Sequence, residues 1–301
     1  MKSKKVVAAV LIAAMITLLG CKNLMREIRG ISPFENYDNV VECWQNENVS
    51  DRKAAEQAIE ALLKAADDGD KDKFMSNFTE ELQESRKFKN AVKEFFKAYP
   101  EGLSECELEA DSISGGGSYD YGHNVLNGYA GWTTWMDDEW YRISMSFCYE
   151  NTDAPEKVGV VDFYIMNMQG DAVRRQESYS NYDYWDDIHL LCDVRSSDEV
   201  DCRMINGIAY LWNETDNPKL TPSQMRAVLE ECGTMQDLIE MVGEPNAAIG
   251  DAYYYELASD GGGPRYLHIL AHSLYGRIVR AVVCGEEEGS GEYGDPLYEN
   301  K

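Results

Sequence analysis

Cys21 is the residue whose type and position point most directly to chemistry. It ends the run Leu-Leu-Gly-Cys, which closes an apolar stretch of roughly 14 residues, shorter than the about 20 that a transmembrane helix needs. Three lysines within residues 2–5 precede that stretch. A positive start followed by a short apolar core is typical of a secretory signal peptide. We therefore expect residues 1–20 to be a signal peptide that ends directly before Cys21.

The four residues Leu18-Leu19-Gly20-Cys21 resemble the lipobox of bacterial lipoproteins. The resemblance implies a diacylglycerol thioether on the Cys21 sulfur, cleavage before Cys21, and anchoring of the mature chain by acyl chains such as palmitate. Lys22 follows, so the Asp that often retains such lipoproteins at an inner membrane is missing. A plain signal peptide that happens to contain a cysteine is the alternative. We expect a lipid-anchored protein at the extracytoplasmic face of the cell membrane.

The charge balance limits the partners of the chain. It has 28 basic and 54 acidic residues, a formal net charge of −26, and loss of residues 1–20 with their three lysines would leave −29. Such a chain repels phosphate backbones, so no nucleic-acid partner is expected. It also repels anionic headgroups. Attachment to the lipid bilayer must therefore come from acyl chains on Cys21, and two or more chains give stable attachment where one binds only marginally.

Seven cysteines follow the lipobox, and their spacing shows no repeated framework. An odd number leaves at least one thiol unpaired in a monomer. No two cysteines are separated by two residues, so neither a zinc ribbon nor a thioredoxin-type redox site is expected. Cys148, Cys232 and Cys284 lie in apolar-patterned elements, which predicts small core residues. Cys192 and Cys202 flank a polar stretch and could close a hairpin, with or without a disulfide.

Three further groupings contain residue types that bind metals or transfer protons. His268 and His272 are four residues apart, but their surroundings indicate a strand, so we expect edge-strand histidines rather than metal ligands. The Asp-Gly-Asp-Lys-Asp run at 68–72 lacks the Gly and Glu of an EF-hand, which favours a turn between helices. Asp162 shares a strand face with Tyr164, as in cavity enzymes, and a solvated face is the favoured alternative. We therefore predict no catalytic residue, metal or cofactor, and no enzyme.

Two clusters combine aromatic rings with carboxylates. The first surrounds Asp137-Asp138-Glu139, and the second lies at residues 179–187. Flat rings beside carboxylates are suited to stacking on sugars with hydrogen bonds to hydroxyls, and exposed aromatic residues also anchor protein interfaces. Packing in the core or between domains is the alternative, because aromatic residues bury large areas. The predicted ligand-binding residues are Trp132, Trp135, Tyr179, Tyr182, Tyr184 and Trp185.

The elements that must position these residues follow a tether at residues 21–49. Ser50 can cap the first helix, whose apolar residues recur at helical spacing. Further on, the apolar period changes to two, which predicts half-buried strands whose Val161, Phe163 and Ile165 face the core. Helices are expected at residues 51–67, 71–85 and 86–98, and strands at 141–149 and 158–166.

A domain boundary is expected near residues 190–218, where charged and small residues precede an Asn-Pro pair. Beyond it, Thr221 and Thr234 can each cap a short helix, the first with a proline at its first position. Three strands should follow, and the acidic tail 286–301 should be flexible. The strands are expected at residues 252–257, 266–271 and 277–284.

Two regions resemble known lipoprotein families. The segment Ala-Leu-Leu-Lys-Ala-Ala-Asp-Asp-Gly-Asp (61–70), the Phe-rich helices after it and the strand pair around 149–159 resemble a bacterial lipoprotein family of unknown function. That resemblance implies a cystatin-like or nuclear-transport-factor-like cone. Residues 221–229, the run Met-Gln-Asp-Leu-Ile-Glu-Met-Val-Gly-Glu-Pro (235–245) and the strands after it are similar to SmpA/OmlA-like and β-lactamase-inhibitor-like modules. Those modules usually bind proteins or complete assemblies.

The expected fold class is α+β. A cone-shaped domain with helices on a curved antiparallel sheet should occupy residues 50–200, and a small two-helix, antiparallel-meander domain residues 201–285. The expected role is binding of an envelope protein or glycan, without catalysis. The alternative is a small-ligand carrier or cavity enzyme that uses the N-terminal cone, which requires a deep pocket containing a desolvated carboxylate of raised pKa.

Overall fold

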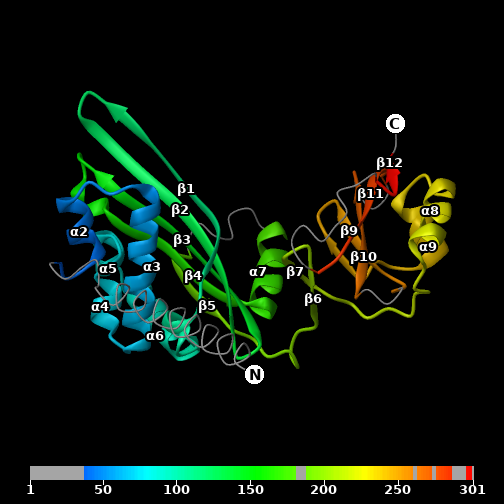
Figure 1. Ribbon diagram of the computed structural model, residues 1–301, viewed down its shortest axis with the longest axis horizontal. Coiled ribbons are helices and arrows are strands. Elements are labelled where there is room, and N and C mark those ends of the chain that lie inside the picture. Colours follow the sequence, from blue (N-terminus) through cyan, green and yellow to red (C-terminus); the bar gives the residue numbers. More distant parts are fainter. Residues whose placement is uncertain (1–36, 181–187, 260–262, 273–275, 287–295, 300–301) are drawn as a thin grey trace, which may run out of the picture.

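The computed structural model describes residues 37–180, 188–259, 263–272, 276–286 and 296–299. These residues form two α+β parts that lie side by side along the long axis of the molecule (Figure 1), which confirms the expected fold class. The first part, residues 40–193, and the second part, residues 202–299, each place helices on a five-stranded sheet. Cys21 and the predicted signal peptide lie outside the described residues. Within those residues, no helix combines the length and apolar character needed to cross a membrane.

The first helices pack as one layer on the first sheet. The helix cap predicted at Ser50 is confirmed. The Ser50 side chain accepts a hydrogen bond from the backbone N–H of Lys53 at the start of α3. Val40, Cys43 and Trp44 are buried in the core, so helix α2 lies within the stretch predicted to be a tether and packs on the first part. The helices are α2 (Val40–Asn46), α3 (Asp51–Asp67), α4 (Lys71–Met75), α5 (Glu80–Glu84) and α6 (Arg86–Ala98).

The first sheet has the strand order β1-β2-β3-β4-β5. Neighbouring strands in this sheet are antiparallel except for β4 and β5, which are parallel and are joined through helix α7. The apolar face predicted for β3 is confirmed, because every second residue from Tyr141 to Tyr149 is buried. The alternation is incomplete, because Ser144 and Cys148 on the opposite face are buried as well. The elements are η1 (Leu103–Glu105), β1 (Glu109–Asp120), β2 (His123–Met136), β3 (Glu139–Asn151), η2 (Pro155–Lys157), β4 (Gly159–Asn167), α7 (Met168–Ser180) and β5 (Leu190–Asp193).

Two local expectations for the first part are wrong. The helix predicted over residues 71–85 is broken between α4 and α5, because the backbone of Asn77 and Thr79 hydrogen-bonds to Val160 at 2.9 and 3.1 Å. The register of β4 against β3 also shifts at Val161, so Val160 is buried and Val161 is only half-buried. Both deviations arise from strand pairing, which competes with the local apolar period.

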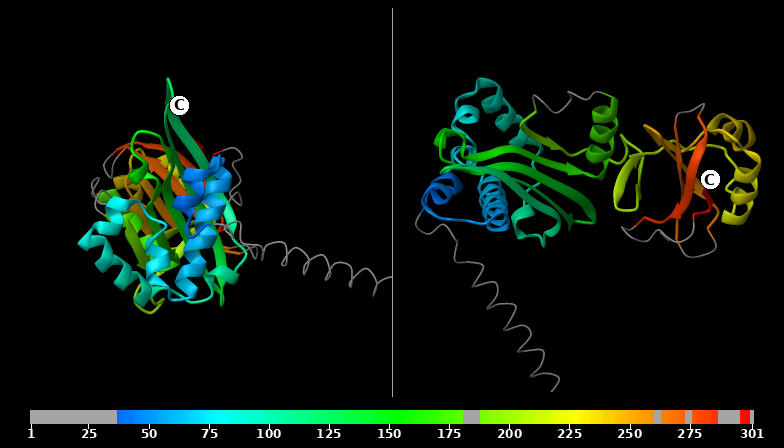
Figure 2. Two further views of the ribbon diagram at one scale, coloured as in Figure 1. Left: turned by 90° about the vertical axis from the view of Figure 1, so that its left-hand side faces the viewer. Right: turned by 90° about the horizontal axis from the view of Figure 1, so that it is seen from above.

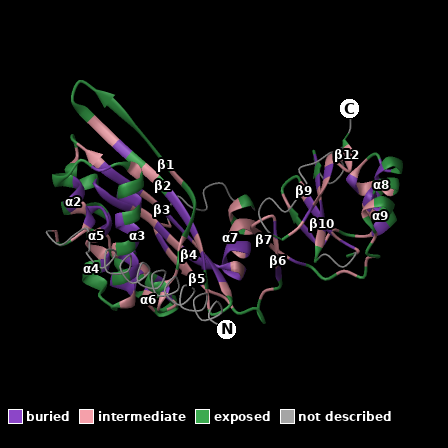
Figure 3. Ribbon diagram, in the orientation of Figure 1, coloured by how far each residue is buried: buried purple, intermediate pink, exposed green. Residues whose placement is uncertain are grey.

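Aromatic rings fill the space between the helices and the first sheet, where Figure 3 shows buried residues on the inner faces. Phe74 is fully buried, and its ring centroid lies between 5.0 and 6.0 Å from those of Phe78, Phe95, Phe96 and Phe163. Such distances are typical of packed aromatic pairs. The space in which a cone-shaped cavity enzyme would need its pocket is therefore occupied by side chains.

Helix α7 connects the two parts. It packs against the hairpin of β6 (Cys202–Ile205) and β7 (Ile208–Leu211), which lies between the two larger sheets in Figures 1 and 2. Ala172 of α7 is buried together with Cys202 and Ala209 of the hairpin. The predicted Cys192–Cys202 hairpin is wrong, because Cys192 belongs to the first sheet and both thiols are free.

The second part follows the predicted order of two helices and an antiparallel meander. Thr221 and Thr234 each form a capping box at a helix start. The tail is not wholly without structure, because Tyr298 and Glu299 pair with the neighbouring strand. The elements are α8 (Pro222–Glu231), α9 (Met235–Val242), β8 (Ala247–Ile249), β9 (Ala252–Leu257), β10 (Arg265–Ala271), β11 (Ile278–Cys284) and β12 (Tyr298–Glu299), and the sheet order is β12-β11-β10-β9-β8.

The two faces of the second sheet have different covers. One face packs on α8 and α9 and is fully apolar at its centre, where Leu267 and Ile269 are completely buried. The other face meets the β6–β7 hairpin, through a cluster that includes Ile205, Trp212 and Tyr254. A hairpin of two short strands is narrower than a five-stranded sheet, so part of this face remains accessible.

Candidate functional site

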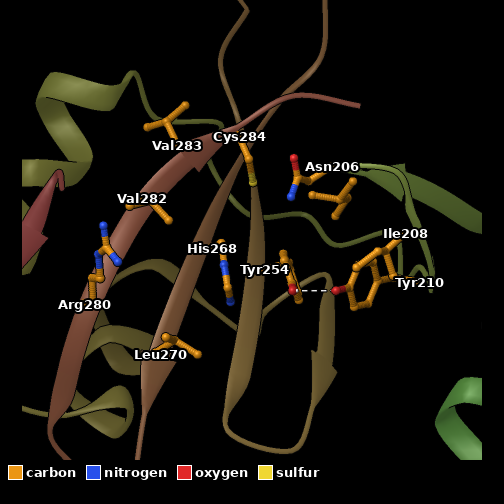
Figure 4. Close-up of a pocket in the computed structure, with 11 residues that line it drawn as sticks. Asn206, Ile208, Tyr210, Tyr254, His268, Leu270, Arg280, Val282, Val283 and Cys284 are labelled. Atoms are coloured by element: carbon orange, nitrogen blue, oxygen red, sulfur yellow. Dashed lines mark hydrogen bonds between the residues drawn. The ribbon is translucent and has the colours of Figure 1, made fainter. Parts of the chain in front are cut away.

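A cavity of about 290 Å³ lies between the β6–β7 hairpin and the face of the second sheet that points away from α8 and α9. Figure 4 shows side chains of β9, β10 and β11 on one side of it and side chains of the hairpin on the other. Its walls include Ile208, Tyr210, Tyr254, His268, Leu270, Arg280 and Val282.

The period of two along each strand gathers these residues. His268 lies opposite Tyr254 on one neighbouring strand and opposite Val282 on the other, and Leu270 lies opposite Arg280. Directly opposite residues of antiparallel strands share one face of the sheet. The five side chains therefore form one patch, although they come from three strands that are separated in sequence.

Three rings form one wall of the cavity. The His268 ring stacks on Tyr254 with a centroid distance of 4.8 Å and an interplanar angle of 10°. The Tyr254 hydroxyl donates a hydrogen bond of 2.8 Å to the Tyr210 hydroxyl, drawn as a dashed line in Figure 4. Burial raises the pKa of both tyrosines, so both hydroxyls stay protonated at neutral pH. The Tyr210 ring lies 4.4 Å from the Tyr254 ring at an interplanar angle of 43°, so Tyr254 is packed between Tyr210 and His268, as Figure 4 shows.

Two nitrogens at this cavity are buried without a partner. Nε2 of His268 and Nε of Arg280 have no hydrogen-bond partner in the described part of the chain. Burial, and then the nearby Arg280 charge, lower the pKa of His268 below its ordinary value. The imidazole is therefore neutral at neutral pH, and it offers one donor and one acceptor. Buried polar atoms without partners are rare in folded proteins and call for a specific explanation.

Arg280 is the cation of the cavity. No carboxylate among the residues that the structure describes lies within 4.0 Å of its guanidinium, although Glu299 is its cross-strand neighbour on β12. A guanidinium keeps its charge at any physiological pH and presents planar donors that match a carboxylate. The arrangement can hold an anionic group beside an apolar surface.

Two lining groups do not form a nucleophile with its base. Burial raises the pKa of the Cys284 thiol to about 11, so this lining residue is not a reactive thiolate at neutral pH. His268 has an aromatic ring on one side and no acid or hydroxyl bonded to Nε2 among the described residues.

The structure separates the aromatic residues predicted to bind a ligand. Trp132 is 3 % exposed and belongs to the first core, so its predicted place on a binding surface is wrong. Trp135 is 65 % exposed at the end of β2. Tyr179 is 56 % exposed near the end of α7, where its ring lies against the backbone of Gly250 in the second part. Tyr182, Tyr184 and Trp185 lie outside the described residues.

Asp162 takes part in a hydrogen-bond network on the face of the first sheet opposite to the aromatic core. It lies on the face of β4 opposite to the buried Phe163, accepts a hydrogen bond of 2.5 Å from Ser146, and lies 3.0 Å from Nδ1 of His189. Both neighbours bind the same carboxylate, so the Ser146 hydroxyl has no imidazole to accept its proton. This arrangement is a surface hydrogen-bond network and not a nucleophile with a base.

The histidine prediction needs a correction as well. β10 is the central strand of the second sheet, so His268 is not an edge-strand residue. His272 is exposed and follows the end of that strand. Among the residues that the structure describes, no group of three or more His, Cys, Asp or Glu side chains could hold a metal ion.

Sequence reasoning missed the cavity because it missed the β6–β7 hairpin. A signal for that hairpin is present, since Asn206-Gly207 stands between two β-branched residues, Ile205 and Ile208. Both turn residues have positive φ, +51° and +75°, as a two-residue hairpin turn requires. The Asn-Gly pair therefore predicts the cover of the cavity, while nothing local predicts which sheet face it covers.

Comparison with known proteins identifies one region. Residues 61–168 match the family model described as a domain of unknown function, DUF5104. The match runs from within α3 to the start of α7, so it includes most of the first part and none of the cavity residues. A search of curated proteins found no match to the chain. The resemblances to a cystatin-like cone and to SmpA/OmlA-like modules remain predictions.

Proposed function

We propose that this protein is a membrane-anchored, extracytoplasmic lipoprotein that binds a small molecule in the cavity of its second part. The observation that carries the proposal is the pair of buried, unpartnered nitrogens of His268 and Arg280 at one cavity. A ligand with acceptor and donor atoms would give each nitrogen the partner that the described chain does not supply.

The size and lining of the cavity support a small ligand. Its volume of about 290 Å³ is at the lower end of the range for small-molecule sites. Most of its lining consists of aliphatic and aromatic side chains with few polar atoms, which is the usual composition of such sites. A macromolecular partner would instead need a broad exposed surface.

The anchoring part of the proposal rests on the lipobox resemblance and on charge. A formal net charge of −26 prevents attraction to anionic headgroups, so acyl chains on Cys21 would supply the attachment. Cys21→Ser should move the protein from the membrane fraction to the soluble fraction and abolish labelling by a palmitate analogue. Lys22→Ser is the matched control and should leave both unchanged. Membrane retention of Cys21→Ser would contradict the anchor.

Ligand binding is tested with two matched probe pairs, benzoate with benzamide and indole-3-acetate with indole-3-acetamide. Saturation-transfer NMR on the full-length protein should show saturable binding of at least one probe. Val282→Phe should weaken every bound probe about tenfold or more, because the added ring occupies the cavity. Met241→Phe, on the exposed side of α9, should leave affinity unchanged. Absence of binding by all four probes, or equal affinity in Val282→Phe, would overturn the proposal.

An envelope glycan is the second candidate ligand, and a groove in the first part favours it. The groove has a volume of about 550 Å³ and combines the amides of Gln45, Asn48 and Asn151 with the edges of the largely buried Trp44 and Tyr149 rings. Amides and flat rings suit hydroxyl-rich, uncharged ligands. Asn48→Ala should then reduce retention on purified peptidoglycan, whereas Asn127→Ala, outside the groove, should not. Equal retention of both variants would exclude a glycan at this groove.

A further inference from the structure

We propose that the ligand of this cavity is a small organic anion with an apolar body, whose carboxylate-like group lies beside Arg280 and His268 and whose body lies against Leu270 and Val282. The inference rests on the proposed function and names the chemical class of the ligand. Nothing in the match to residues 61–168 assigns it, because that match ends before the cavity residues.

The apolar walls determine the body of the ligand. Leu270 on the same strand and Val282 on the neighbouring strand flank His268, and all three line the cavity. Leu270 is 39 % exposed. An apolar group of the ligand that lies against Leu270 and Val282 would exclude water from both side chains.

The charge of Arg280 determines the polar end. In a chain with a formal net charge of −26, this cation is half-buried and has no ion-pair partner among the described residues. A cationic ligand would be repelled, and a neutral one would leave the guanidinium without a counter-charge. A carboxylate would accept hydrogen bonds from the guanidinium and compensate its charge in one contact.

A phosphate ion or a phosphate ester fits the site less well. Phosphate sites combine several backbone N–H groups or several cations, as at the start of a helix. Here one guanidinium and one imidazole face a mostly apolar surface, which leaves most oxygens of a phosphate without donors. One planar, singly charged group is the better match.

Anion binding should be coupled to proton uptake by His268. Burial and the Arg280 charge hold the free imidazole neutral, whereas an anion between the two would raise the imidazole pKa again. Affinity should therefore rise as the pH falls from about 8 to about 6, while a carboxylate ligand stays ionised. The charged or titratable groups that face His268 are Arg280 and Cys284 on β11, Tyr254 on β9, Tyr210 on β7 and Glu299 on β12.

Isothermal titration of the full-length protein with each acid and its matched amide tests the ligand class. The acids should bind at least about tenfold more tightly than the amides, and Arg280→Gln should remove that difference. Arg277→Gln, at an exposed position outside the cavity, should retain it. Glu299→Gln should tighten binding of the acids alone, because it removes a competing carboxylate near Arg280. In His268→Gln the pH dependence between about 6 and 8 should disappear.

The outcomes separate the two proposals. Equal affinity for acid and amide, or equal loss of both in Arg280→Gln, overturns the anionic class and leaves the cavity as a binding site. Failure of every probe to bind overturns the proposed function itself. If Arg280→Gln loses its cooperative thermal transition, the variant is unfolded and Glu299→Gln takes its place in the test. Unchanged affinity of Glu299→Gln for the acids would contradict a charge-based site.

Discussion

The two sheets of this protein differ in how completely they are covered. Helices α2 to α6 cover the inner face of the first sheet, and aromatic rings fill the space between them. The second sheet has one face under α8 and α9, but its other face meets only the β6–β7 hairpin. A broad cover produces a packed core, whereas a narrow cover leaves a cavity beside it.

Buried polar atoms without a partner lie outside the helical layer of the first part. Of the five such side-chain atoms in the described residues, two belong to α7 (Gln169 and Arg175) and three to the second part (Trp212, His268 and Arg280). In the helical layer, by contrast, the buried Gln57 accepts a hydrogen bond from Trp44 and donates one to Cys43. An unmet polar group costs stability, and of these five atoms those of His268 and Arg280 belong to residues that line the cavity.

The largest effect should come from the packed core of the first part. Phe74→Ala should lower the free energy of unfolding by about 3–5 kcal/mol, because Phe74 is fully buried and contacts four other aromatic rings. Leu270→Ala, at the open face of the second sheet, should cost about 1 kcal/mol or less. Urea unfolding measures both, and similar losses would erase the distinction between the two sheets.

The cover of the cavity should be the next most sensitive element. Gly207 has a φ of +75°, so Gly207→Ala should cost about 1–2 kcal/mol of hairpin stability. Because the hairpin forms one wall, binding of the acid probes should weaken as well. Gly233→Ala is the control, since Gly233 is not among the residues with positive φ and lies outside the cavity. Unchanged titration curves for Gly207→Ala would show that the hairpin does not shape the site.

The two parts should also differ in their response to acid. The folded pKa of His268 is below its ordinary value of 6.5, so the unfolded chain binds the proton more readily, and stability of the second part falls as the pH drops below about 7. In the first part, burial opposes ionisation of Asp193, but Arg195 and Arg174 outweigh it and lower the pKa of Asp193. That contribution is present above about pH 4 and is lost only as the pH falls further.

Urea unfolding of the wild type and of His268→Gln at about pH 8 and about pH 5.5 tests this difference. The wild type should lose stability between the two values, and the variant should lose less. Asp193→Asn should lower stability at both values, because its pKa lies below both. An identical pH dependence in wild type and His268→Gln would place the acid-sensitive group elsewhere.

Elements with local signals could be predicted from the sequence, and the cavity could not. Thr221 and Thr234 place α8 and α9 because capping is a contact between residues three apart in the chain. The sequence also predicts β9, β10 and β11 of the second sheet, but neither β8 nor β12. The cavity depends instead on which sheet face the hairpin meets, a non-local packing outcome. Whether Val161 faces the core likewise depends on how β4 pairs with β3. The burial of Trp132 depends on helices that lie more than 30 residues away in the sequence.

The smallest effect should come from the exposed aromatic residue of the first part. Trp135 is 65 % exposed, so Trp135→Ala should change the free energy of unfolding by no more than about 0.5 kcal/mol. Trp132→Ala, three residues earlier on the same strand, should cost several times more because Trp132 is buried. Urea unfolding of the two variants compares them directly. A large loss in Trp135→Ala would mean that this ring packs against a further element, and the open surface would then be confined to the second part.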